Sequence, residues 1–336
     1  MAQNKNVACL TCRRSCRNVK IVDKILPIRY AHVMEKQELQ PEPPGGNLEA
    51  IEGTHVKNTV YPKIKNAITL CLLFLALNLG SSLLIFAFLH LSGLSQDSLT
   101  GEIALMFAAV ICFGTVILIG YKKTKRKFNE VFKFNAVSPF LWVTVTILTI
   151  GLIIVLSALG NLLNLVLPMP EWLNQIFESM MVEQPLVISI LNVGVLAAFT
   201  EELFFRGLIL DGLNKNYSKR KAIIVSALLF GLIHLNPWQF LSAFIIGLFL
   251  AWICIETGSI WLCIFIHFLN NTLITVLSRY SASIPIQGFN SDYSAPVEFE
   301  PWWFTLFGAL MLALGMAMLI REFRKAKAPV QAGPLP

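Results

Sequence analysis

The chain has 336 residues, of which 55% are hydrophobic and 14% charged, with a formal net charge of +7 and a mean hydropathy of +0.65. Soluble domains carry about a quarter charged residues, so this composition excludes an ordinary soluble protein and predicts an all-α, polytopic membrane protein. The positive charge does not indicate nucleic-acid binding, because most lysines and arginines flank apolar runs, where they report membrane orientation.

A polar, basic leader covers residues 1–66 and is expected to be largely flexible. A membrane domain of about eight transmembrane helices is predicted over residues 67–320. Segment 168–185 is too polar to cross a bilayer and predicts an amphipathic helix on the outer surface. The charged, Pro-rich end, 321–336, is predicted to be a disordered cytoplasmic tail. The predicted spans are 67–91, 103–120, 138–167, 186–212, 221–236, 238–255, 259–278 and 302–320.

The distribution of Lys and Arg predicts the orientation of these spans. If the leader is cytoplasmic, 26 of the 27 Lys and Arg fall on the same side, in the leader, the tail and the segments 121–137 and 206–221, and the other side holds only Arg279. Cytoplasmic connections carry the excess of positive charge in membrane proteins. We therefore expect a multi-pass protein of the cell membrane with both termini in the cytoplasm and an even number of spans.

The leader contains three closely spaced cysteines, Cys9, Cys12 and Cys16. They resemble the beginning of a zinc knuckle with His32 as a distant fourth ligand, but structural zinc sites usually show paired cysteines on both sides. Reduced cytosolic thiols on a basic arm are the preferred interpretation. The other four cysteines lie in apolar runs and are expected to be buried: Cys71, Cys112, Cys254 and Cys263.

The fourth predicted span contains "AAFTEELFFRGLIL", which places Glu201, Glu202 and Arg206 among apolar residues. Each charged residue at mid-bilayer costs roughly 2.5–3.5 kcal/mol, so pairing, a polar cavity or both must offset the cost. Glu202 and Arg206 are spaced i,i+4 and predict an ion pair within one helix. Glu201 has no such partner and is expected to face other helices across a polar intramembrane cavity.

Polar residues at a similar depth occur on two later spans. "FGLIH" places Phe230 and His234 on one helix face, and "HFLNN" places His267 and Asn271 one turn apart. At a rise of ~1.5 Å per residue, Glu201, His234 and Asn271 lie roughly 17–20 Å from the cytoplasmic ends of their spans, and His267 about 12 Å. We therefore predict that these groups meet in one layer of the membrane.

This set of residue types suits hydrolysis of a peptide bond. A carboxylate and a neutral imidazole together take a proton from a water molecule, which then attacks a carbonyl carbon. A second imidazole and a carboxamide donate to the oxyanion that forms. No Ser or Cys pairs obviously with a His and an acid, so a covalent nucleophile is the weaker hypothesis.

The motifs Glu-Glu-x-x-x-Arg, Phe-x-x-x-His and His-x-x-x-Asn, in this order on three spans, resemble those of the CPBP intramembrane proteases. That family includes the type II CAAX prenyl endopeptidases and bacterial Abi and bacteriocin-processing relatives. The resemblance covers residues 185–278, which form the expected catalytic core, and leaves out the leader, the outer surface helix and the tail.

The resemblance implies roles for the motif residues. It implies that Glu201 and His234 activate the water and that His267 and Asn271 stabilise the oxyanion. The remaining motif residues support the carboxylate or line the site: Glu202, Arg206 and Phe230.

The cofactor prediction is that none is needed, with zinc as the alternative. Glu201, His234 and His267 are the residue types that bind zinc, and members of the family are often classed as metalloproteases. The sequence lacks the His-Glu-x-x-His spacing of zinc proteases, so a metal-free mechanism is favoured.

The expected partner is a lipid-embedded or lipidated peptide or protein, and whether the substrate is prenylated stays open. Two other functions are weighed. A transporter or channel also places acids and histidines at mid-membrane, but it predicts polar residues on most spans, whereas the first three and the eighth carry almost none. A non-catalytic immunity or scaffold protein predicts the loss of a catalytic position, and all are present.

Overall fold

The computed structural model describes residues 60–95, 98–284, 286–289 and 297–327. All of them belong to one compact unit, Lys57–Pro336. The predictions for most of the leader, including those for Cys9, Cys12, Cys16 and His32, lie outside the described residues.

The residues that the structure describes form helices and no β-strand, which confirms the all-α prediction. Several helices are joined end to end, and three stretches have π-helical geometry. The elements are α1 Ile64–Leu91, α2 Leu99–Thr124, α3 Phe128–Val131, α4 Pro139–Val166, α5 Glu171–Glu178, η1 Ser179–Glu183 (π), α6 Leu186–Ser189, η2 Ile190–Leu196 (π), α7 Ala197–Glu202, η3 Leu203–Ile209 (π), α8 Leu210–Asn216, α9 Lys219–Leu232, α10 Pro237–Thr257, α11 Trp261–Arg279, η4 Ser281–Ser283 (3-10) and α12 Trp302–Lys327.

Within the described residues, seven helices are long and apolar enough to cross a membrane. They correspond to seven of the expected spans, and the continuous helix from α6 to α8 is one of them. The remaining expected span, 221–236, corresponds to α9, which has 14 residues. At 1.5 Å per residue α9 is about 21 Å long and falls short of a ~30 Å hydrocarbon core. The segment expected to form a surface helix is helical, as α5 and η1.

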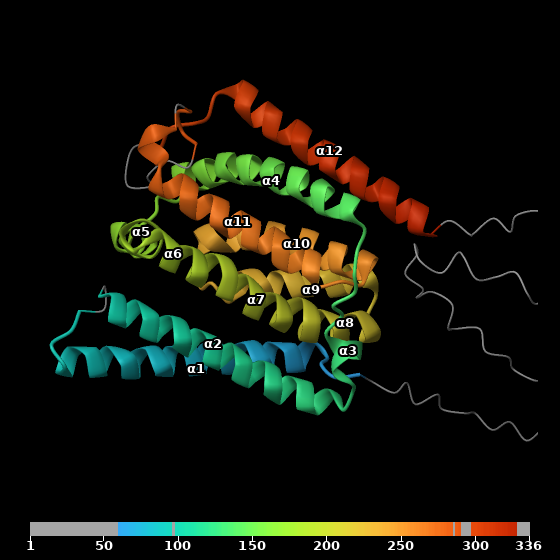
Figure 1. The fold of residues 1–336 in the computed structure, drawn as a ribbon, viewed down its shortest axis with the longest axis horizontal. Coiled ribbons are helices and arrows are strands. Elements are labelled where there is room, and N and C mark those ends of the chain that lie inside the picture. Colours follow the sequence, from blue (N-terminus) through green and yellow to red (C-terminus); the bar gives the residue numbers. More distant parts are fainter. Residues whose placement is uncertain (1–59, 96–97, 285, 290–296, 328–336) are drawn as a thin grey trace, which may run out of the picture. The chain divides into compact units, whose positions relative to one another are not determined.

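The helices are arranged in layers (Figure 1). α4 and α12 pack against each other on one side, and α1 and α2 form a pair on the other. The helices from α6 to α11 lie between these pairs, so the segment that carries Glu201 and Glu202 is in the interior of the bundle.

Glycines allow α4 and α12 to approach closely. A Cβ atom at Gly151 of α4 would lie 2.4 Å from the backbone nitrogen of Leu312, and one at Gly315 of α12 would lie 2.8 Å from the Cα atom of Leu148. Between transmembrane helices the apolar lipid gives little hydrophobic driving force, so close van der Waals packing at small residues holds the pair together.

A row of aromatic rings runs through the interior from α1 to the polar residues. Phe74 stacks on Phe113 with ring centroids 3.9 Å apart, and Phe204 continues the row from Phe113 at 5.8 Å. Phe205 follows, and its ring lies 5.2 Å from that of Phe230. The apolar surroundings exclude water from the charged groups next to them.

The four cysteines expected to be buried are buried: Cys71, Cys112, Cys254 and Cys263.

A tight connection at the sequence "NPW" joins α9 to α10. Leu235 adopts a left-handed conformation (φ 57°), which ends α9. The Asn236 side chain accepts a hydrogen bond from the Gln239 backbone N–H at 2.8 Å, and Pro237 takes the first helical position. Both residue types suit these positions, because an Asn cap satisfies a free N–H and Pro lacks one.

The structure differs from the expected disordered tail over residues 321–327, which continue α12. Glu322 and Lys325 form an ion pair at 2.6 Å, and Lys327 lies 2.7 Å from Glu256 of α10. Ion pairs at helical spacing and to a neighbouring helix stabilise such an extension. The rest of the predicted tail, 328–336, lies outside the described residues.

Candidate active site

Glu201 and Glu202 lie on α7, a stretch of six residues between two π-helical stretches, η2 and η3. The sequence predicts one regular helix over the whole segment. The wider turns are visible in backbone bonds that span five residues, from the Ala197 N–H to the Asn192 carbonyl and from the Leu210 N–H to the Phe205 carbonyl. Such π-helical insertions occur frequently at functional sites.

Glu202 and Arg206 form the ion pair that their spacing predicts. Arg206 Nη1 donates to Glu202 Oε1 at 2.9 Å, and neither side chain has exposed surface. Arg206 Nη2 donates to the Gly247 carbonyl of α10 at 3.4 Å. The pair neutralises two charges that would be very costly separately in an apolar interior.

His267 of α11 bonds to the same carboxylate. Its Nδ1 atom lies 2.9 Å from Glu202 Oε1, and the imidazole is 7% exposed. Since an ionised carboxylate only accepts hydrogen bonds, Nδ1 carries the proton and Nε2 is the ring nitrogen left for chemistry. The sequence predicts that His267 lies in the site, but its spacing from Glu202 does not indicate this bond.

Phe230 of α9 is the ring around which three polar side chains gather. The guanidinium carbon of Arg206 lies 4.2 Å from the ring centroid. The imidazoles of His234 and His267 pack at 5.5 Å and 5.6 Å, with their planes nearly perpendicular to the ring. Phe230 therefore contacts three of the predicted site residues, and a cation over an aromatic face is an attractive arrangement.

His234 lies just beyond the end of α9 and is half-buried. Its Nδ1 atom is 3.0 Å from the carbonyl oxygen of Phe230, in the preceding turn. This bond fixes the ring and leaves Nε2 as the second nitrogen that can bind a water or a substrate.

Asn271 and Glu201 complete the predicted set. Asn271 Nδ2 donates to the Val193 carbonyl of η2 at 2.8 Å. Glu201 is half-buried, and its buried Oε2 atom has no hydrogen-bond partner among the described residues. Within the same part of the chain, no hydrogen bond or ion pair joins Glu201 to His234. The structure therefore ties Glu202, Arg206 and His267 together and leaves Glu201 Oε2 outside that network.

The zinc alternative requires Glu201, His234 and His267 to converge on one point. Among the described residues, no group of three or more His, Cys, Asp or Glu side chains is placed to hold a metal ion. These three side chains are therefore not arranged as a ligand set in this structure.

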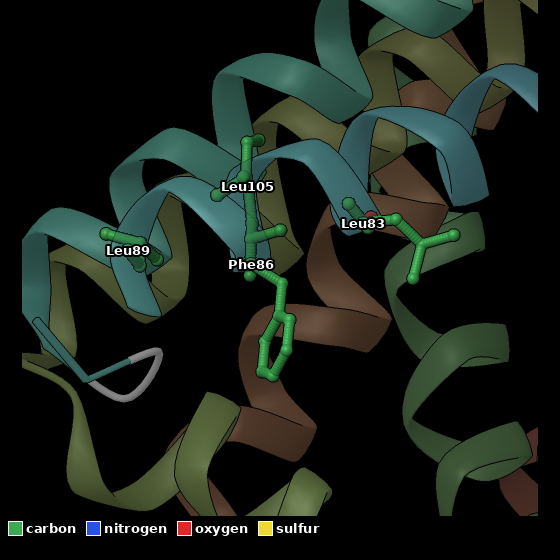
Figure 2. A pocket seen from close by; sticks show the side chains of 6 residues that line it. Leu83, Phe86, Leu89 and Leu105 are labelled. Carbon is green, nitrogen blue, oxygen red and sulfur yellow. The ribbon is translucent and has the colours of Figure 1, made fainter. Parts of the chain in front are cut away.

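A separate hollow of about 380 Å³ lies between α1 and α2 (Figure 2). Apart from Ser82 its lining is apolar, and it offers no acid or base. It is therefore distinct from the polar site. The apolar lining residues are Leu83, Ile85, Phe86, Leu89 and Leu105.

The fold and the site define an all-α, polytopic membrane protein with a buried cluster of acidic, basic and imidazole side chains. Residues 183–273 match the model of the family described as type II CAAX prenyl endopeptidase Rce1-like. This match confirms the resemblance to the CPBP proteases, and it spans every predicted site residue. The family is one of peptide hydrolases that act within membranes. Neither a curated protein nor a solved structure matches the chain.

Proposed function

We propose that the protein is an intramembrane endopeptidase that hydrolyses a peptide bond near the C-terminus of a prenylated protein or within a membrane-associated peptide. The observation that carries the proposal is the division of labour between the two adjacent glutamates. Each glutamate has one buried oxygen, Oε2, without a partner among the described residues, but Glu202 bonds through Oε1 to both Arg206 and His267, whereas no hydrogen bond or ion pair of Glu201 is formed within the same residues. One acid holds the site together and the other is free to react.

Glu201 and His234 are proposed to activate the attacking water. Glu201 Oε2 accepts the proton of the water, His234 Nε2 holds the same water, and the oxygen attacks the peptide carbonyl carbon. The proton then moves from Glu201 to the departing amine nitrogen, so the carboxylate is regenerated. General acid–base catalysis of this kind contributes about 10²–10⁴-fold to a rate.

His267 and Asn271 are proposed to stabilise the oxyanion. With Nδ1–H directed at Glu202, His267 donates through Nε2 only when the ring is an imidazolium. Glu202, Arg206 and a protonated His267 together carry one net positive charge, which complements an oxyanion. Removing one oxyanion donor typically costs about 10²–10³-fold in kcat.

The proposed setting is the cell membrane with both termini in the cytoplasm, as the distribution of Lys and Arg predicts. A prenylated C-terminus or a membrane peptide then reaches the interior of the bundle from the cytoplasmic leaflet. No metal is assigned to the reaction, and zinc is retained only as the alternative that a chelator tests.

A cleavage assay in membranes tests the proposal. We expect the wild type to cleave a farnesylated peptide with a C-terminal CAAX sequence or an unprenylated membrane peptide, and Glu201→Gln and His234→Ala each to lose about 10²–10⁴-fold. Glu171→Gln on the surface helix α5 and His90→Ala at the exposed end of α1 are matched controls and should cleave normally. Wild-type rates in both site variants would show that the protein is not this protease, and loss of cleavage on adding chelator would favour zinc.

A further inference from the structure

In the π-helical stretch η2, one backbone carbonyl accepts a hydrogen bond from the neighbouring helix α11. Its last wide bond runs from the Ala197 N–H to the Asn192 carbonyl. Where a π-turn returns to α geometry, one carbonyl is passed over by the N–H groups of its own helix. The next carbonyl in the chain is that of Val193, and it accepts the hydrogen bond from Asn271 Nδ2 at 2.8 Å.

The second π-helical stretch shows the same pattern. In η3 the last wide bond runs from the Leu210 N–H to the Phe205 carbonyl. The next carbonyl, that of Arg206, is contacted by Cys254 Sγ of α10 at 4.0 Å. In both stretches a side chain from a neighbouring helix contacts the carbonyl that the wide turn leaves without a bond in its own helix. These contacts link the stretches on either side of α7 to α11 and α10.

Asn270 holds the other end of the Asn271 carboxamide. Asn270 Nδ2 donates to Asn271 Oδ1 at 3.1 Å, and Asn270 is 4% exposed. The Asn271 amide is therefore hydrogen-bonded at both ends: its nitrogen donates to one group and its oxygen accepts from another. Nδ2 carries two protons, and the bond to Val193 uses one of them.

These two bonds decide which end of the Asn271 amide reaches the substrate. If the amide turned over, Asn271 Oδ1 would face the Val193 oxygen, and its NH₂ group would face the NH₂ group of Asn270. Both bonds would be lost, and two partly buried pairs of like groups would be opposed. Only the observed orientation keeps both bonds and places the second Nδ2–H on the Val193 side, where it is proposed to donate to the oxyanion.

We propose that Asn270 is a positioning residue for Asn271. Together with the carbonyl that η2 releases at Val193, it fixes the carboxamide with a free N–H toward the reacting carbonyl. This inference rests on the proposed function, because it concerns the oxyanion role of Asn271. Asn270 itself touches neither the substrate nor the water.

The test measures kcat and KM for cleavage of the farnesylated CAAX peptide by Asn270→Leu. We expect kcat to fall roughly 10- to 100-fold, because a misplaced group costs up to about 10²-fold, while KM changes little. Asn270→Gln keeps a donor and should recover part of the loss. Asn161→Leu is the matched control. It removes another buried Asn, whose side chain donates to the Gly288 carbonyl at 2.7 Å, and it should leave kcat unchanged.

A double variant separates positioning from general destabilisation. If Asn270 acts only through Asn271, Asn270→Leu has no further effect in an Asn271→Ser protein under single-turnover conditions. Losses that multiply would overturn the inference, as would equal kcat values for Asn270→Leu and Asn161→Leu. Glu201→Gln in the same assay tests the proposed function separately, because normal cleavage by this variant would show that the protease assignment is wrong. If Glu201→Gln is inactive but the rate losses of the Asn270 and Asn271 variants multiply, only this inference is overturned.

Discussion

Glu202 is completely buried and accepts hydrogen bonds from Arg206 and His267 at the same oxygen, Oε1. Arg206 in turn lies over the ring of Phe230. A buried ion pair of this kind contributes little net stability relative to apolar residues, but breaking it leaves an uncompensated charge. The arrangement is thus best understood as a rigid support that sets the direction of His267.

Replacing one member of the Glu202–Arg206 pair should therefore lower the free energy of unfolding more than replacing both members. We expect Glu202→Gln and Arg206→Met each to lower the free energy of unfolding by about 3–5 kcal/mol, since each leaves one buried charge. The double variant should be more stable than either single one. Thermal unfolding in detergent or nanodiscs measures all four proteins, and additive losses in the double variant would contradict the support role.

Some of these contacts follow from the sequence and some do not. The Glu202–Arg206 pair follows from the i,i+4 spacing, which places both side chains on one helix face. The His267–Glu202 bond joins residues 65 positions apart, so the rotation of α11 against α7 decides it, and spacing within one helix does not encode that rotation. Asn270 is visible in "HFLNN", but its contact with Asn271 joins neighbours that normally diverge around a helix.

The helix that carries the two glutamates packs closely against α11 at the irregular stretch η2. A Cβ atom at Gly194 in η2 would lie 2.6 Å from Oγ1 of Thr272. The missing side chain lets α11 approach η2 closely at the position next to Val193, whose carbonyl accepts from Asn271. The π-turns leave no periodic signal in an apolar sequence, because the widening adds only one residue per turn.

Gly194→Ala tests this close approach. The added methyl group should lower stability by about 1–3 kcal/mol, as overpacking usually does, and should also reduce kcat by displacing Asn271. Removing the opposing hydroxyl and methyl groups with Thr272→Ala in the same chain should recover most of both losses. Circular dichroism melting and the cleavage assay together check this, and a double variant no better than Gly194→Ala would contradict the steric explanation.

Other features of the elements were predictable because their chemistry is local. The Asn-Pro pair after His234 marks the beginning of α10, and Asn236 caps it. The length of α9 was less predictable. The predicted span extends to residue 236 because Ile233 and Leu235 are apolar, but the left-handed Leu235 and the capping turn end the helix at Leu232.

The bundle depends on helices outside the matched segment. α4 and α12 pack together, and α4 also contacts both α10 and α11. Apolar length and flanking charge predict where such helices lie in the chain. Their partners could not be predicted, because in lipid the pairing depends on the shapes of the two surfaces rather than on hydrophobic pattern.

Gly151→Ala should weaken this pairing. Its Cβ atom would lie 2.4 Å from a backbone nitrogen of α12, which cannot move aside as a side chain can. We expect a loss of about 1–3 kcal/mol in the free energy of unfolding. Gly114→Ala on α2, where nothing lies within 4 Å of the added atom, is the matched control. Equal melting temperatures for both variants would show that the α4–α12 contact does not limit stability.

The central claim is that Glu201 and His234 act on one water molecule as a single unit. Single-turnover cleavage of the farnesylated CAAX peptide by Glu201→Gln, His234→Ala and the double variant measures this directly. Groups that act as a unit give strongly non-additive losses, so we predict that the double variant is about as slow as the slower single variant. Losses that multiply in the double variant, or wild-type cleavage by either single variant, would contradict the account.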